Sequence, residues 1–104
     1  MKAFELPIDE EFADAVRARL ENLLRREVRA ARTEIQDNGY FLLVSAEIAE
    51  GTANVAARDV LERGAQLLRQ EMPSRENDYS WLLNITRHGQ VIEAMPGGWV
   101  GLSP

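Results

Sequence analysis

The sequence predicts an α+β fold in which two helices pack on one face of a mainly antiparallel sheet of four to five strands. Two observations carry this prediction. Asn38-Gly39 separates the alternating run 31–36 from the apolar run 40–49, and such a pair is a strong hairpin signal because a type I′ turn needs positive φ at both central positions. Stretches with the apolar periodicity of helices stand on either side of this hairpin.

The N-terminal segment predicts a short first strand. Phe4, Leu6 and Ile8 alternate with polar or constrained residues, which is the period of a strand with one buried face. Pro7 would confine the end of this strand to an edge or terminus, because proline has no N–H to donate to a neighbouring strand. A sheet of five strands depends on this element.

The first helix is expected to begin near Glu10. Asp9 is a favourable N-cap, and the acidic residues after it complement the positive end of the helix dipole. Capping explains this acidic run better than a cation site, because the run lacks the spaced oxygen ligands of a calcium loop. At about 100° per residue the apolar side chains gather on one face. They are Phe12, Val16, Leu20, Leu23 and Leu24.

The sequence favours an end of this helix at about Arg26 and a strand over residues 27–36. In a longer helix Glu27 and Glu34 would lie on the apolar face, where unpaired carboxylates are unfavourable. The strand needs no buried acid. It would point Ala31, Thr33 and Ile35 inward and Arg32, Glu34 and Gln36 outward.

A long helix remains the alternative. Gly39 could be its terminating residue, with Ile35 and Tyr40 in the hydrophobic contact that accompanies such an end. The choice affects function, because a long helix would gather four arginines into one exposed stripe able to meet an acidic protein or another anion. They are Arg17, Arg25, Arg29 and Arg32.

A second helix is expected from an N-cap at Thr52 to Met72, where Pro73 prevents continuation. Gly64 lies at the centre of its apolar face and permits a close approach, either to the protein's own sheet or to a second subunit. The inner face consists of Ala53, Ala57, Val60, Leu61, Gly64, Leu67, Leu68 and Met72.

The last part of the chain predicts a second hairpin. Residues 79–87 form a strand with alternate apolar side chains, His88-Gly89 is a two-residue turn, and residues 90–95 form the partner strand. Residues 96–98, Pro-Gly-Gly, are expected to break the sheet.

The expected order of elements is that of the ferredoxin-like fold, β-α-β-β-α-β, with an extra C-terminal strand. Without the first strand, the order becomes a helix followed by a hairpin, twice. Either order gives a single domain over residues 1–104, ending in the apolar tail 96–104.

Composition narrows the classes of function. The 104 residues include no cysteine, which excludes disulfides, thiolate metal sites and a cysteine nucleophile. No apolar run is long enough for a membrane span or a signal peptide, so we expect a cytoplasmic protein without membrane contact. The net charge of −5 argues against general nucleic-acid binding, although residues 17–32 carry six arginines and only two glutamates.

No catalytic constellation is recognisable, so we favour a protein that is not an enzyme and that has no cofactor or metal. His88 is the only histidine, which excludes sites that need two imidazoles. Its neighbour Gly89 favours a turn, in which histidine tolerates positive φ. The sequence has neither a Gly-x-Ser-x-Gly elbow nor a glycine-rich phosphate loop.

These observations favour a small non-catalytic domain that binds another protein or a second copy of itself. The candidate binding residues are the four arginines and the apolar side chains of the tail, which could fold back or add to a partner's sheet. The tail residues are Trp99, Val100 and Leu102.

Two alternatives remain. One is a small enzyme or ligand-binding domain with a cleft near the second hairpin, where the polar groups would be Asp78, Arg87, His88 and Glu93. The other is a nucleic-acid-linked regulator that uses the arginine stripe.

Overall fold

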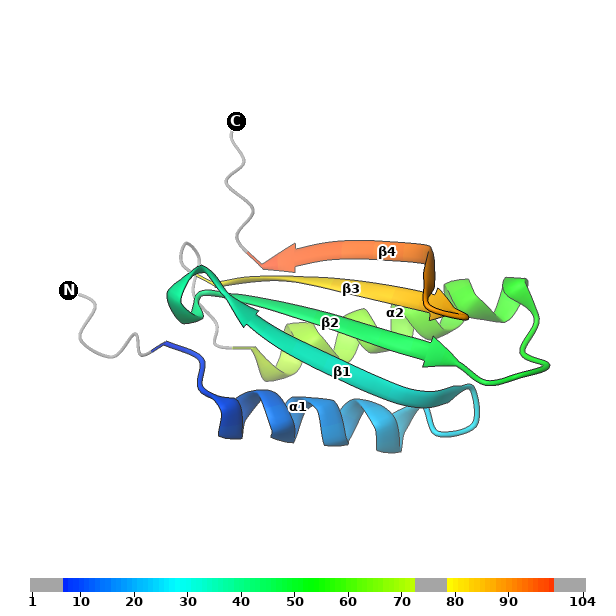
Figure 1. Ribbon diagram of the computed structural model, residues 1–104, viewed down its shortest axis with the longest axis horizontal. Coiled ribbons are helices and arrows are strands. Elements are labelled where there is room, and N and C mark those ends of the chain that lie inside the picture. Colours follow the sequence, from blue (N-terminus) through cyan, green and yellow to red (C-terminus); the bar gives the residue numbers. More distant parts are fainter. Residues whose placement is uncertain (1–6, 73–78, 99–104) are drawn as a thin grey trace.

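In the computed structural model, which describes residues 7–72 and 79–98, two helices lie on one side of a four-stranded sheet (Figure 1). The elements in chain order are α1 Glu10–Leu23, β1 Val28–Gln36, the short 3-10 helix η1 Asp37–Gly39, β2 Phe41–Ile48, α2 Asn54–Glu71, β3 Ser80–Arg87 and β4 Gln90–Gly98. The predicted α+β class is confirmed.

The sheet is mixed, with the strand order β1-β2-β3-β4. The two outer pairs are antiparallel, whereas β2 and β3 are parallel because α2 crosses between them. A helix followed by a hairpin therefore occurs twice. The ferredoxin-like order and a fifth strand are not found in the described part of the chain, where α1 precedes all strands. Phe4 and Leu6 lie outside the described residues, and Ile8 is not in a strand.

Helix α1 begins at its predicted cap. The Asp9 carboxylate accepts a hydrogen bond from the N–H of Phe12 at 2.8 Å. The helix ends at Leu23, before the predicted end near Arg26. Leu24 is the C-cap, and its carbonyl accepts two N–H groups of the turn that leads into β1. The long-helix alternative is therefore wrong.

Strand β1 has the predicted orientation. Ala31 faces the core, Thr33 and Ile35 are half-buried, and Arg32, Glu34 and Gln36 are exposed. The side chain of Glu21 reaches across from α1 and accepts the backbone N–H of Ala31 at 2.8 Å. This donor of β1 is thus satisfied by a helix side chain and not by another strand.

The first hairpin closes through a longer turn than the two residues predicted at Asn38-Gly39. Gln36 pairs with Phe41, so four residues connect the strands, and three of them have positive φ: Asp37, Asn38 and Gly39. The incoming chain explains the difference, because the N–H of Ile8 donates to the carbonyl of Gly39 at 2.8 Å. A Cβ on Gly39 would lie 2.4 Å from the Cβ of Pro7.

Helix α2 begins at Asn54 with Ala53 as its N-cap, and no side chain caps it. The prediction of Thr52 as the N-cap is wrong. The carbonyl of Thr52 instead accepts a hydrogen bond from the Arg87 guanidinium, which also donates to Asn54 Oδ1 at 2.8 Å. The guanidinium of β3 thereby ties the start of α2 to the sheet. Of the predicted inner face, Ala53 is exposed and Leu67 half-buried.

The second hairpin has the predicted two-residue turn. Arg87 pairs with Gln90, and both turn residues have positive φ, 54° at His88 and 81° at Gly89. This pair of values suits a type I′ turn, whose twist matches that of the flanking strands.

Residues 96–98 continue β4, which corrects the prediction that they break the sheet. Ser80 of β3 donates its N–H to Tyr40, on the side of β2. Alternation turns Leu82 to the same side, so Pro96 opposite Leu82 has its nitrogen pointing away from β3. A proline at that position of an edge strand removes no hydrogen bond from the sheet.

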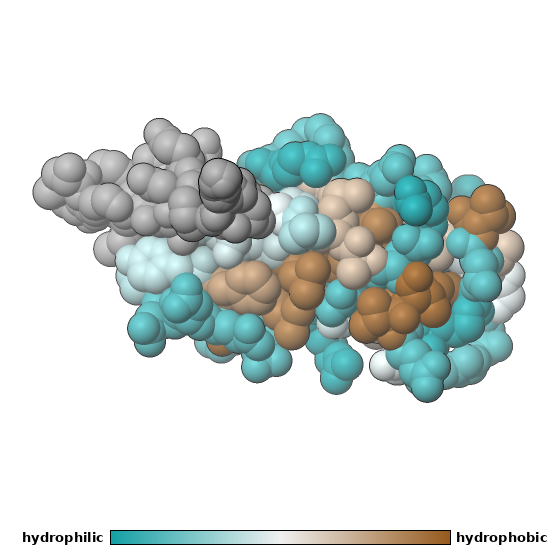
Figure 2. All heavy atoms as spheres, turned by 90° about the horizontal axis from the view of Figure 1, so that it is seen from above, coloured by the Kyte–Doolittle hydropathy of each residue, from teal (hydrophilic) through white to brown (hydrophobic). Residues whose placement is uncertain are grey.

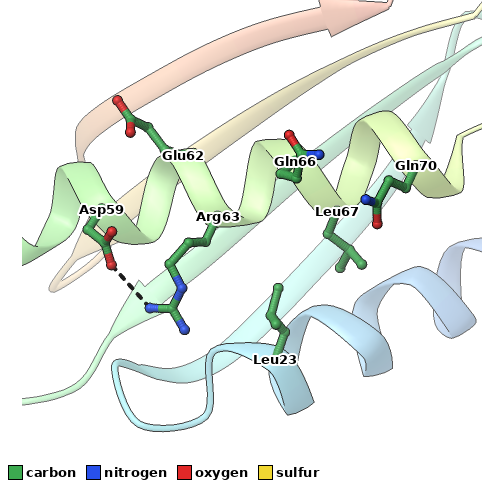
Figure 3. A pocket seen from close by; sticks show the side chains of 7 residues that line it. All are labelled: Leu23, Asp59, Glu62, Arg63, Gln66, Leu67 and Gln70. Carbon is green, nitrogen blue, oxygen red and sulfur yellow. Dashed lines mark hydrogen bonds and ion pairs between the residues drawn. The ribbon is translucent and has the colours of Figure 1, made fainter.

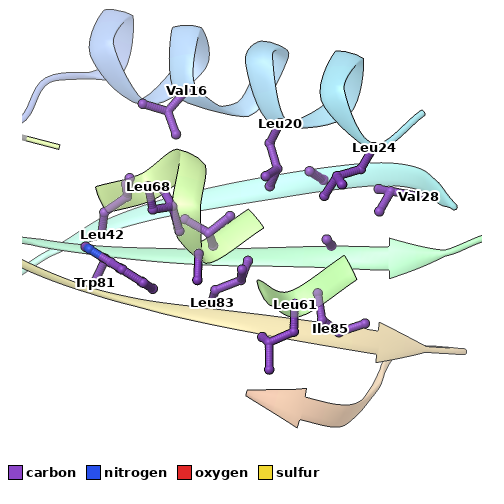
Figure 4. Packing of buried hydrophobic residues seen from close by; sticks show 14 of the residues in the cluster. Val16, Leu20, Leu24, Val28, Leu42, Leu61, Leu68, Trp81, Leu83 and Ile85 are labelled. Atoms are coloured by element: carbon purple, nitrogen blue, oxygen red, sulfur yellow. The ribbon is translucent and has the colours of Figure 1, made fainter. Parts of the chain in front are cut away.

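The hydrophobic core lies between the helices and the sheet (Figure 4). Alternate side chains of the central strands meet the inward faces of both helices. Fully buried large side chains are Val16 and Leu20 of α1, its C-cap Leu24, Leu42 and Val44 of β2, Val60, Leu61 and Leu68 of α2, and Trp81, Leu83 and Ile85 of β3.

Two glycines allow this core to close. A Cβ on Gly64 would lie 2.8 Å from a Leu83 methyl carbon and 3.3 Å from one of Leu20, so the close approach of α2 is to the protein's own sheet and to α1. A Cβ on Gly97 would lie 2.0 Å from Trp81 Cζ2. The indole therefore lies directly against the backbone of β4, which gives the Pro-Gly-Gly segment a packing role.

Candidate functional site

The helices cover only one face of the sheet, and we call the other face the open face. Phe41 and Leu43 of β2 and Leu82 of β3 point to this side and are half-buried. Leu43 lies directly opposite Leu82 in the parallel register. We call these three residues the apolar patch. Figure 2, which views the molecule from above β4, shows apolar groups over the sheet with hydrophilic groups beside them.

The open face becomes polar toward the second hairpin. Glu47 of β2 lies opposite Thr86 of β3, and its Oε1 accepts a hydrogen bond from the Thr86 hydroxyl at 2.6 Å. The same carboxylate accepts the N–H of His88 at 2.5 Å and that of Gly89 at 3.1 Å. Glu47 therefore holds the turn between β3 and β4 from the neighbouring strand.

These hydrogen bonds stabilise the charged form of the Glu47 carboxylate. The donor Thr86 has the largest effect and lowers the pKa of Glu47, burial opposes it, and the N–H groups of Gly89 and His88 lower the pKa further. All three donors stabilise the charged form. The arrangement suits a structural role more than proton transfer, because a general base needs a pKa near the working pH.

Two of the four predicted arginines, Arg29 and Arg32, line the same hollow on the open face. A hollow of about 220 Å³ at its polar end is lined by Arg29, Ala30, Arg32, Ser45, Glu47 and Thr86, and we call it the arginine hollow. A second hollow of about 200 Å³ shares Arg32 and Ser45 with it and is also lined by Leu43. The arginine hollow is thus continuous with the apolar patch.

The other two predicted arginines lie elsewhere. Arg17 pairs with Glu21 at 3.2 Å on α1. Arg25 is in the turn after α1, where it lines a polar hollow with Arg26 and Arg63. Because the helix ends at Leu23, the four arginines do not form the single stripe that a long helix would have given.

A groove of about 360 Å³ runs between the two helices (Figure 3). Leu23 and Leu67 face each other across it, and polar side chains of α2 line the rest, including the ion pair of Arg63 and Asp59 at 3.2 Å. Leu23 was predicted to lie on the buried face of α1, but its exposed fraction is 44%.

The polar residues proposed near the second hairpin are engaged separately. Arg87 binds the start of α2, and Glu93 pairs with Arg58 at 3.3 Å. The His88 side chain is 71% exposed and lies 3.6 Å from the Glu50 carboxylate. Asp78 lies outside the described residues. The described members of this set do not converge on one point.

Trp99, Val100 and Leu102 of the predicted binding set also lie outside the described residues. Glu47, in contrast, was not singled out in the sequence. The sequence did indicate a special role for Glu47, because it is the one acidic residue in a strand of otherwise apolar or small side chains. Such a residue needs hydrogen-bond donors nearby.

Comparison with protein-family models, with curated proteins and with solved structures gives no significant match. Within residues 7–72 and 79–98, no group of three or more His, Cys, Asp or Glu side chains is placed to hold a metal ion. Neither helix in this part of the chain has the length and apolar character needed to cross a membrane.

Proposed function

We propose that this chain is a non-catalytic protein-binding domain whose docking surface is the open face of the sheet. The observation that carries this proposal is the apolar patch. A strand with one solvated face normally alternates apolar and polar residues, but β2 begins with Phe-Leu-Leu-Val and β3 contains Trp-Leu-Leu. Uninterrupted apolar runs are typical of strands covered on both faces, and here the helices cover only one.

The surroundings of the apolar patch support a binding role. Apolar groups rimmed by polar ones are typical of protein interaction sites. The polar rim here includes the arginine hollow. The second hairpin adds exposed apolar side chains, because Val91 is 55% and Ile92 is 36% exposed. Aromatic and arginine side chains, which are enriched at protein interfaces, are both present.

The test compares two surfaces that carry exposed leucines. Peptides are selected from a random display library on the immobilised full-length chain and then assayed against two variants. The first variant, Leu43→Ser with Leu82→Ser, removes most of the apolar patch. The second, Leu23→Ser, removes the exposed leucine of the interhelical groove. We expect the selected peptides to bind wild-type protein and Leu23→Ser but not the double variant.

Two results would contradict the proposal. Selected peptides that lose binding only to Leu23→Ser would place docking in the interhelical groove. Failure to select any peptide, together with a monomer in light scattering at all concentrations, would remove support for a binding domain. A concentration-dependent dimer that is lost in the double variant would identify a second copy as the occupant of the open face. Circular dichroism of each variant checks that it is folded.

A further inference from the structure

The unpaired arginines of the open face identify the chemistry of its partner. Arg17, Arg19, Arg58 and Arg63 each have a carboxylate oxygen within 4 Å. Arg29 and Arg32 are exposed and, like Arg25, Arg26 and Arg69, form no ion pair with any described residue, although the chain as a whole carries a net charge of −5. Of these five arginines, Arg29 and Arg32 are the two that line a hollow next to the apolar patch. Two free guanidinium groups beside a hollow are complementary to an anion.

The one carboxylate that lines the arginine hollow, Glu47, keeps its negative charge but leaves the two-arginine lining with a net positive charge, and it pairs with neither guanidinium. Glu47 lines the hollow, but both of its oxygens accept hydrogen bonds from Thr86 and the second turn. Glu34 lies two positions from Arg32 on the same face and lines the second hollow with Leu43. An incoming carboxylate would therefore be most favourable between Arg29 and Arg32, on the side away from Glu34.

We propose that the open face binds an extended, acidic protein segment in which a carboxylate and a large apolar side chain stand two residues apart. This inference rests on the proposed function and specifies its partner. The carboxylate enters the arginine hollow, and the apolar side chain lies on Leu43.

The spacing follows from the register. Arg32 lies opposite Ser45, and Leu43 is two residues before Ser45 on the same face. Two residues of an extended chain span about 7 Å, which is the diagonal distance between neighbouring positions on one face of a sheet. A segment with its carboxylate at Arg32 therefore brings its second side chain to Leu43.

A nucleic acid fits these observations less well. Its successive phosphates would meet the carboxylates of Glu34 and Glu47 as well as the two arginines, and its affinity would come mainly from neutralised phosphates. The continuity of the arginine hollow with the apolar patch favours a protein segment, which supplies both a carboxylate and an apolar side chain.

The experiment uses fluorescein-labelled synthetic peptides and the full-length chain in fluorescence anisotropy. The first peptide repeats Glu-Thr-Leu between serine-rich ends, the second has Gln in place of Glu, and the third has Ser in place of Leu. We expect the first to bind most tightly, with an affinity that falls as salt is raised. Arg29→Gln with Arg32→Gln should weaken its binding about two- to thirtyfold, the range for two exposed charge pairs.

The matched control is Arg25→Gln with Arg26→Gln, which removes the same charge from two exposed arginines outside the open face. We expect it to leave the affinity unchanged. An equal loss in both double variants would reveal only a general charge effect and would overturn the inference.

The remaining outcomes separate this inference from the proposed function. If the Gln peptide binds as tightly as the Glu peptide and both are lost with Leu43→Ser and Leu82→Ser, the open face binds proteins without the acidic preference. If no peptide binds, the acidic segment is excluded as the partner, and the library selection decides the proposed function separately. Tighter binding of a single-stranded oligonucleotide, lost with Arg29→Gln and Arg32→Gln, would assign the arginines to a nucleic acid.

Discussion

The two faces of the sheet are built from the same strands, yet they differ in what their side chains do. Toward the helices, β2 and β3 present fully buried apolar residues such as Leu42 and Leu83. Away from the helices, their neighbours Leu43 and Leu82 are only half-buried, and further along Glu47 and Thr86 are polar. We expect the covered face to contribute most of the stability and the open face to contribute less.

The largest expected difference in the free energy of unfolding is between substitutions at two neighbouring leucines of β3, Leu83 and Leu82. Leu83→Ala would leave a cavity in the core and should lower the free energy of unfolding by about 2–5 kcal/mol. Leu82→Ala, on the open face, should lower it by about 1 kcal/mol or less. Urea denaturation of both variants measures the difference. Equal losses would show that the two faces are covered to the same extent in solution, for example by a second copy.

A smaller effect is expected at the contact between β4 and Trp81. Gly97→Ala would place a methyl group inside the indole and should destabilise the protein by about 1–3 kcal/mol. The control is Pro96→Ala on the same strand, whose side chain is exposed. The loss from Gly97→Ala should shrink in a Trp81→Leu background, because the two sites are coupled. Additive losses in the double variant would rule out the contact as the cause.

The smallest effect concerns the polar end of the open face. Because the folded state lowers the pKa of Glu47, this carboxylate stabilises the fold above its unfolded pKa, and the stabilisation is lost as pH falls through the folded pKa. Glu47→Gln should therefore lower the free energy of unfolding by about 1 kcal/mol at neutral pH, with partial exposure limiting the effect.

Urea denaturation over a pH series measures this dependence. The difference between wild type and Glu47→Gln should narrow in acid, because the wild-type carboxyl is then protonated. Glu50→Gln is the control, since the Glu50 side chain is 78% exposed and its one ion pair among the described residues is with His88. A difference that stays constant with pH would mean that the charge of Glu47 does not contribute.

The sequence predicted the elements that local chemistry determines. Asp9 as a cap and His88-Gly89 as a two-residue turn depend on neighbours in the chain, and both were confirmed. The first turn was predicted too short because Pro7 and Ile8, far away in sequence, pack against Gly39.

Contacts between distant segments also explain the other errors. Pro-Gly-Gly breaks most strands, but at the edge of this sheet the proline nitrogen faces outward and Gly97 receives the Trp81 indole. The parallel pairing of β2 and β3 has no signal in the local sequence, because the two strands are far apart in the chain and only their hairpin partners are close in sequence. That Arg29 and Arg32 line one hollow on the open face could not be predicted without knowing where α1 ends, because a longer helix would have placed them on a helix surface.

The hydrogen bond from the backbone N–H of Ala31 to the Glu21 carboxylate also affects the outer edge of the sheet. An outer strand with free backbone groups invites further strands from other copies, and such lateral growth leads to fibres. In β1 a carboxylate from α1 occupies one of these donors, and in β4 a proline removes another. With lateral growth hindered at both borders of the sheet, a partner on the proposed docking surface, the open face, would not start a polymer.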